Sequence, residues 1–438
     1  MKLTHALLTM LLVAVLGIAL MFLRAEDGPG SRASGETQSN GLIDALLALA
    51  EPQSSDAAAS PPLGGEVELC DYGRVKSDGD LDLPLTIKAD AALAIERAAT
   101  DLITRGTDRD LAFGLKLRVD AAMRMADANA RRQTPECREN TDCAARLTEN
   151  QSQASAAWAE PLARLALTTR DASAYAYAFH VCANPISSKY AASCSLISAD
   201  RWAQLDPGNA APWLYVASKA HERKDASALE YAAFQISKAQ VSNVGWGADY
   251  VVMQSQAIQA QPRYTQLAIA IDLIGTTAAF PLQYLSALVA FCSTEQMRDE
   301  SRKQLCSGIG NVLVEHDTSL IGFAVGTGIG ERAGWPADRV ARLREEREAM
   351  QAAELTVFLR DDFLSCSSFE KLNARLSAVA RIGEVGAARA LIRQSGRSTA
   401  ELAQQHRQQI NQLTDSAESA LAQKAKAVPP LPGKILHP

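Results

Sequence analysis

From Ala89 onward the sequence follows helical periodicity, and this pattern restricts the chain to an α-helical fold. Long alternation of Val, Ile and Thr, which is typical of half-buried strands, is nearly absent. Alanine is abundant and aromatic residues make up only 5%. This mixture favours closely packed helices, because Ala has the highest helix propensity and lets backbones approach. We therefore predict an all-α protein, with breaks between helices at Gly106, Pro135, Pro185, Pro207, Pro262, Pro281 and Pro336.

Two stretches of the helical region are near copies of one another: RDASAYAYAF (Arg170 to Phe179) and KDASALEYAA (Lys224 to Ala233). Each follows a helix and a short polar turn, and each begins a second helix. The fuller unit spans Leu205 to Ala239, where alanines occupy the positions at which two helices would cross and Trp213 lies beside them. Because repeated helical units stack on their neighbours, we predict a helical-hairpin repeat array over residues 66–428.

The segment Leu205 to Ala239 resembles a tetratricopeptide repeat, a helix hairpin of about 34 residues with an early Trp and with Ala in its second helix. Leu205-Asp206-Pro207-Gly208-Asn209 resembles the linker of that family, whereas Ala217 stands where Gly is commoner. The two near copies lie farther apart than one such unit, which an insertion at Ala183 to Ser195 would explain. The resemblance implies a degenerate tetratricopeptide-like α-solenoid, whose concave surface would bind peptides or proteins.

The eight cysteines contain no Cys-x-x-Cys pair, which argues against zinc-ribbon and thioredoxin-like sites. Six are close neighbours in sequence and two are left over, so the preferred pairs are Cys137/Cys143, Cys182/Cys194, Cys292/Cys306 and Cys70/Cys366. Eight cysteines allow 105 pairings, so this assignment is a preference. An even number with this spacing is typical of disulfides in an oxidising compartment. Buried free thiols in a cytosolic protein are the alternative.

Residues 1–24 form the expected transmembrane anchor or signal sequence. The unbroken apolar run of residues 6–23 is just long enough to cross a bilayer core of about 30 Å. Cleavage after Ala25 is the alternative, although Leu23 fits poorly three residues before the cut. Lys2 on the near side favours a body outside the cytosol. With the cysteines, this predicts a single-pass inner-membrane protein with its body in the periplasm, or a soluble periplasmic or secreted protein if cleavage occurs.

Residues 25–65 are rich in Gly, Ser, Ala, Pro and Gln, so we expect a disordered linker interrupted by a short apolar helix at Gly41 to Ala50. An extended lead-in at Glu66 to Val75 begins the ordered body. The apolar stretch Leu267 to Phe291 is predicted to form two buried helices broken near Pro281, because its polar residues argue against a second membrane span. A long helix at residues 398–427 would close the body, and residues 429–438 form a Pro-rich tail.

No catalytic, cofactor-binding or metal-binding residue is predicted, because the metalloprotease, serine-hydrolase and phosphate-loop motifs are all absent. The net charge of −6, without a basic cluster, argues against a nucleic-acid partner. Four glycines at a spacing of four lie on one helix face and predict a close helix crossing: Gly322, Gly326, Gly330 and Gly334.

We therefore expect a protein-interaction scaffold that binds other envelope proteins or peptides and is held at the inner membrane by residues 6–23. Its groove is expected at the aromatic helix faces of Tyr175, Tyr177, Trp213, Tyr215 and Tyr231. One alternative is an envelope enzyme with a site assembled from dispersed residues such as His180, His221 or Glu315, and another is a structural spacer or an oligomerisation element that uses the glycine stripe. A buried cleft where ionisable groups meet would favour the enzyme, and a long open groove with exposed aromatic rings would favour the scaffold.

Overall fold

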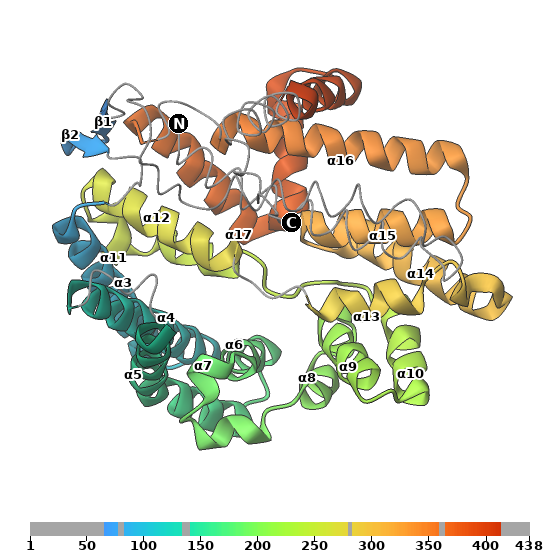
Figure 1. Cartoon of the computed structure of the whole chain (residues 1–438), viewed down its shortest axis with the longest axis horizontal. Helices are drawn as coiled ribbons and strands as arrows, with labels where there is room; N and C mark the ends of the chain where they lie inside the picture. The colour runs from blue at the N-terminus through green and yellow to red at the C-terminus, as the bar shows by residue number, and fades with distance from the viewer. Residues whose placement is uncertain (1–64, 78–82, 134–140, 279–282, 359–363, 413–438) are drawn as a thin grey trace, which may run out of the picture.

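The structure is a computed structural model, and it describes residues 65–77, 83–133, 141–278, 283–358 and 364–412 (Figure 1). The expected anchor at residues 1–24, the expected linker up to residue 64 and the Pro-rich tail at residues 429–438 lie outside these residues. Within the described ranges no helix is both long enough and apolar enough to cross a bilayer. The membrane anchor therefore stays a prediction.

The described part of the chain is all-α apart from one hairpin, which confirms the predicted fold class. The expected lead-in is this hairpin, in which β1 (Gly65–Leu69) pairs antiparallel with β2 (Gly73–Ser77). Helices of the first half are α3 (Leu85–Arg105), α4 (Asp108–Gln133), α5 (Thr141–Thr168), α6 (Ala172–Ala183), α7 (Pro185–Ser188), η2 (Ala192–Leu196) and α8 (Ala199–Leu205). α3 ends at Gly106, as the sequence predicts, and this glycine adopts the left-handed conformation.

The second half is equally helical. Its elements are α9 (Ala210–Glu222), α10 (Ala226–Ser237), η3 (Ala248–Gln254), α11 (Gln256–Gln259), α12 (Arg263–Ala278), α13 (Gln283–Phe291), η4 (Gln296–Arg298), α14 (Glu300–His316), α15 (Leu320–Arg332), α16 (Ala337–Phe358) and α17 (Cys366–Ser395). Residues 399–412 form a further helix, the described part of the predicted terminal helix. The stretch Leu267 to Phe291 contains two helices, α12 and α13, as expected.

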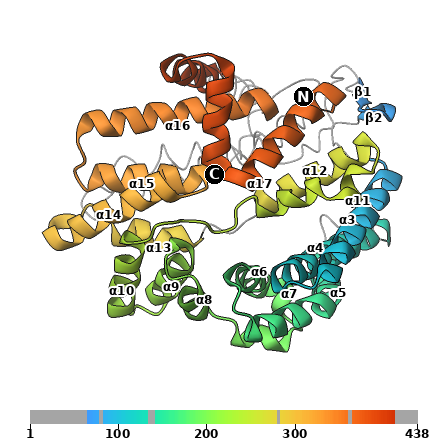
Figure 2. The same cartoon turned by 180° about the vertical axis from the view of Figure 1, so that it is seen from behind.

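Successive helices pack side by side in two runs, one from α3 to α5 and one through α9, α10, α14, α15, α16 and α17. In Figure 1, α3 to α5 lie at the lower left and α9, α10, α14 and α15 lie on the right. Both views place α17 between α16 and α12 (Figures 1 and 2). The order in space departs from the order in sequence. After α10 the chain crosses to η3, α11 and α12 beside α3, and then returns to α13 beside α9.

The repeated Asp-Ala-Ser-Ala is a helix start in both copies. Asp171 caps α6 by accepting a hydrogen bond from the Ala174 N–H at 2.9 Å. Asp225 caps α10 in the same way, from the Ala228 N–H at 3.0 Å. Such a cap satisfies one of the free N–H groups at a helix N-terminus. In the hairpin of α9 and α10, small residues at the crossing are fully buried, as the pattern predicts: Ala217, Ala232 and Ala233.

The glycine stripe is used inside the chain, where α15 crosses α14. A Cβ atom at Gly326 would lie 2.6 Å from the Leu313 Cβ, and one at Gly330 would lie 2.2 Å from the Trp335 ring. The predicted close crossing is therefore confirmed at Gly326, whereas Gly330 leaves room for the Trp335 side chain. Gly334 instead follows the end of α15 with a φ of 83°. The neighbours of the stripe belong to the same chain, which removes the argument for oligomerisation through it.

Three expected disulfides are present: Cys70–Cys366, Cys182–Cys194 and Cys292–Cys306. Cys143 is disulfide-bonded as well, and Cys137, its expected partner, lies outside the described residues. The Cys182–Cys194 bond joins α6 to η2 within the segment that the sequence suggests as an insertion. The Cys70–Cys366 bond joins the β-hairpin to the start of α17 across 296 positions of sequence.

Residues 239–247, which we name the crossing segment, run between the two halves of the molecule. The Val241 carbonyl accepts a hydrogen bond from the Ala210 N–H at 2.7 Å, at the start of α9. The Ser242 carbonyl accepts one from the Thr318 N–H at 3.1 Å, just before α15, and the Thr318 carbonyl accepts one from the Glu384 N–H at 2.7 Å. Glu384 follows a kink in α17 at Gly383, whose φ is 72°. The crossing segment is thus hydrogen-bonded to the start of α9 and to Thr318, just before α15. Thr318 is in turn hydrogen-bonded to α17 at its kink.

Candidate functional site

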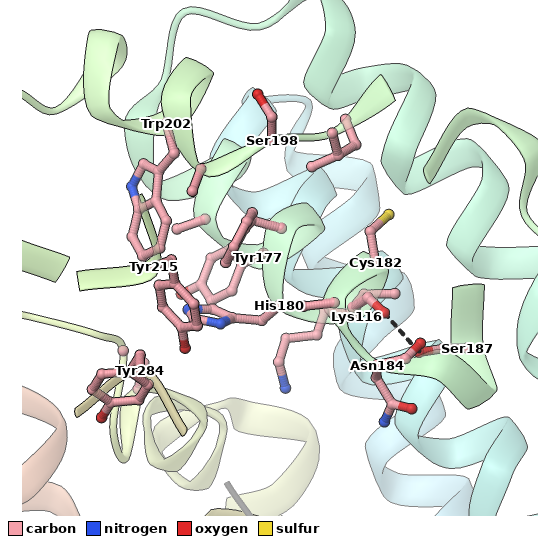
Figure 3. Close-up of a pocket in the computed structure, with 18 of the residues that line it drawn as sticks. Lys116, Tyr177, His180, Cys182, Asn184, Ser187, Ser198, Trp202, Tyr215 and Tyr284 are labelled. Carbon is pink, nitrogen blue, oxygen red and sulfur yellow. Dashed lines mark hydrogen bonds between the residues drawn. The ribbon is translucent and has the colours of Figure 1, made fainter. Parts of the chain in front are cut away.

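A cavity of about 1120 Å³ opens where α4, α6, α8, α9, α13 and the crossing segment meet. It is the candidate functional site of the described part of the chain. In Figure 3, Trp202, Tyr215 and Tyr284 lie along one side with His180 beside them, and the Lys116 side chain lies farther from these rings. A concave, mostly apolar cavity with a few polar groups is the usual form of a ligand site.

One wall of the cavity consists of aromatic rings from four helices. The ring centroids of Trp202 and His180 are 5.4 Å apart, those of His180 and Tyr215 are 5.9 Å apart, and those of Tyr215 and Tyr284 are 5.0 Å apart. Tyr177 lies one turn before His180 on α6 and stacks on Phe113 at 5.2 Å. These contacts hold each ring against its neighbours, so the wall is rigid before any ligand arrives.

Two polar atoms of this wall are buried and lack a hydrogen-bond partner among the described residues: the Trp202 Nε1 and the Tyr215 Oη. Trp202 is only 1% exposed. Burial also raises the pKa of the Tyr215 phenol, so this group stays protonated. A buried polar group without a partner costs about 1–3 kcal/mol.

The opposite side of the cavity carries a buried charge cluster. The Lys116 ammonium on α4 lies 2.8 Å from an Asp120 carboxylate oxygen and 2.5 Å from an Asp249 oxygen. Burial alone would lower the pKa of Lys116, but the two carboxylates outweigh burial and raise it. The lysine therefore stays protonated. Its positive charge and the two carboxylate charges give the three side chains together a net charge of −1.

His180 is a neutral imidazole. Burial is the main cause that lowers its pKa to about 3, and the nearby Lys116 charge adds to the effect. A hydrogen bond with the Val244 backbone opposes this shift and ties the ring to the crossing segment. A Cβ atom at Gly245 would lie 3.8 Å from Nε2. The crossing segment thus forms part of the cavity and touches its histidine.

Of the five aromatic residues expected in the groove, Tyr177 and Tyr215 line the cavity. Tyr175 is buried in the core, where its hydroxyl accepts a hydrogen bond from the Ser198 N–H at 3.1 Å. Trp213 and Tyr231 contact each other edge to face at 5.6 Å, and neither belongs to the cavity lining.

The dispersed enzyme residues do not come together. His180 lines the cavity, but His221 is exposed near the end of α9, and Glu315 pairs with Arg339 at 3.4 Å on the surface. Lys116 and Asp249, which are 133 positions apart, were not predicted as site residues. Their separation explains this, because no local pattern connects α4 with η3.

One group with metal-ligand spacing occurs within the described ranges: Cys70, Asp71 and Cys366, whose ligand atoms lie within 4.8 Å of one another. The two cysteines are bonded to each other. Cysteine binds a metal as a thiolate. Because both cysteines are in a disulfide, this group is a disulfide with a neighbouring carboxylate.

The tetratricopeptide-like classification depends on the residues of Leu205 to Ala239 and stays a prediction. The function has to be inferred from the cavity. Comparison of the chain with known protein families, curated proteins and solved structures finds no match.

Proposed function

We propose that the protein is a membrane-anchored periplasmic scaffold that holds a segment of a partner protein or peptide in the cavity. The observation that carries the proposal is the aromatic wall of the cavity, to which Trp202, Tyr215 and Tyr284 contribute. Such rings give a bound segment a large apolar contact area.

An extended polypeptide suits these features. It offers a series of side chains that contact ring faces. The volume of about 1120 Å³ exceeds the range of roughly 300–1,000 Å³ in which small-molecule pockets usually fall. Helical-repeat proteins commonly use their concave side in this way, in line with the resemblance of Leu205 to Ala239.

The proposed location depends on two features. Three disulfides between described residues are typical of an oxidising compartment. The apolar run at residues 6–23 would hold the body at the inner membrane. Periplasmic proteins and peptides are then the partners within reach.

A pair of matched substitutions tests the binding site. Ser218 lines the cavity on α9, whereas Ser227 is exposed on the neighbouring α10. In Ser218→Trp the new ring occupies the cavity. The full-length protein, purified in detergent without reductant, is mixed with a random library of labelled peptides, and bound peptides are quantified. We expect Ser218→Trp to lose at least about 90% of the bound signal and Ser227→Trp to retain it, since only the first variant fills the site.

Circular dichroism checks that both variants keep their helix content. Equal retention of peptides by Ser218→Trp and the wild type would remove the cavity from the proposal. Binding of no peptide at all by the wild type would reject the proposed function.

The enzyme is the second candidate, because ionisable side chains do meet in the cavity: Lys116, Asp120, Asp249 and His180. Two features oppose it. The Lys116 ammonium is paired with both carboxylates. The pKa of His180 is lowered to about 3, so the imidazole is a weak base that takes up a proton far less readily than a general base with a pKa near neutrality. Mass spectrometry of the recovered library separates the two candidates. Intact peptides favour the scaffold, and cleaved or modified peptides that disappear in His180→Gln favour the enzyme.

A further inference from the structure

The cluster of Lys116, Asp120 and Asp249 has one more negative than positive charge. Its side chains are only 13%, 14% and 15% exposed, respectively. Water screens such a cluster poorly, so the excess charge acts strongly on anything that enters the cavity. This inference depends on the proposed function, because it concerns the segment held in the same cavity.

The other charged residues of the lining do not neutralise the excess. Arg124 is bonded to Asp272 at 3.3 Å and to Thr276 at 3.0 Å. Lys219 pairs with Glu222 at 2.9 Å. The lining as a whole carries four cationic and five anionic side chains. The cavity is therefore acidic, and its charge is most deeply buried at the Lys116 cluster.

The aromatic wall also favours a cation. Burial keeps the Tyr177, Tyr215 and Tyr284 phenols protonated by raising their pKa values. The faces of neutral aromatic rings attract cations. A guanidinium group fits both surfaces better than an ammonium group, because it stacks on rings and donates paired hydrogen bonds to a carboxylate.

We infer that the partner segment carries an arginine whose guanidinium lies between the aromatic wall and the Asp120–Lys116–Asp249 cluster. The charge of the side chain fixes which segment is bound, and the rings of the aromatic wall contact the residues beside it.

Four peptide pools test the inference. They share random flanks and differ only at the central residue, which is arginine, lysine, citrulline or glutamate. Citrulline has nearly the shape of arginine without its charge. We expect the arginine pool to bind the full-length protein about tenfold more tightly than the citrulline pool, with lysine between them and glutamate weakest.

Two substitutions link this preference to the cluster. Asp249→Asn removes one negative charge from the cavity, and Asp338→Asn is a control at an exposed ion pair on α16. The ratio of arginine to citrulline binding should fall severalfold in Asp249→Asn and stay unchanged in Asp338→Asn. Asp120→Asn repeats the test if Asp249→Asn folds poorly.

The outcomes separate the two proposals. If no pool binds, or if Ser218→Trp binds every pool as well as the wild type, the proposed function fails. If the pools bind in the cavity but citrulline equals arginine, only the arginine inference fails. Tightest binding of the glutamate pool overturns it outright, and so does an unchanged ratio in both Asp→Asn variants of the cluster.

Discussion

Removal of the carboxyl charge at Glu384 should stabilise the protein at alkaline pH. Glu384 is half-buried beside the start of α15, where its carboxylate accepts a hydrogen bond from the Leu320 N–H at 2.8 Å. Burial raises the pKa of Glu384 from 4.5 to about 7, against the opposing effect of that hydrogen bond. The neighbouring Glu354 charge adds to the rise, and Arg375 reduces it. The folded protein therefore holds this proton more tightly than the unfolded chain does.

The sign of the pH effect follows from linkage. Because the pKa is higher in the folded state, Glu384 contributes stability below about pH 4.5, and this contribution is lost as pH rises to about 7. At 1.36 kcal/mol for each pKa unit, the loss is about 3 kcal/mol. In Glu384→Gln the amide oxygen can still accept the Leu320 N–H, but no charge is buried at high pH.

Urea unfolding at about pH 4.5 and about pH 8 measures the effect. We expect Glu384→Gln to unfold within about 0.5 kcal/mol of the wild type at the lower pH and to be up to about 3 kcal/mol more stable at the higher pH. Glu230→Gln, at an exposed position of α10, should change neither value. The reasoning is refuted if the wild type and Glu384→Gln lose stability in parallel as pH rises.

Three further substitutions test features of the fold. Gly326→Ala should destabilise by roughly 1–3 kcal/mol through overpacking, whereas Gly275→Ala, where a Cβ meets nothing within 4 Å, should stabilise by about 0.5–1 kcal/mol; urea midpoints that move together would contradict this. Asp225→Ala should cost about 1 kcal/mol by removing the cap of α10, and an unchanged midpoint would count against the cap. Replacing Cys70 and Cys366 together by Ser should cost roughly 2–5 kcal/mol in thermal unfolding without reductant, and no loss would show that this bond adds no stability.

The sequence predicted the local features because their causes are local. Gly106 ends a helix in the left-handed conformation, and Asp171 and Asp225 begin helices through their own side chains. The near-neighbour cysteines pair as the chain order suggests for Cys182/Cys194 and Cys292/Cys306. Each of these signals depends on a few consecutive residues, so a single sequence contains it.

The cavity could not be predicted because its members come from distant segments. Helical periodicity indicates which side chains turn inward, but a core position and a cavity position have the same pattern. Tyr175 and Tyr177 illustrate this, since one is buried in the core and the other lines the site. The kink at Gly383 could not be predicted from the sequence either. The residues around it have a helical pattern, and the positive φ of this glycine accompanies a close contact with Thr318, which is distant in sequence.

The bond between Cys70 and Cys366 changes how a pull on the N-terminal side would spread through the molecule. Without it, the force would act first on α3 and would unfold the helices one after another. With it, the force passes through the disulfide directly to the start of α17. The residues between the two cysteines then carry less of the force, because the disulfide bypasses them.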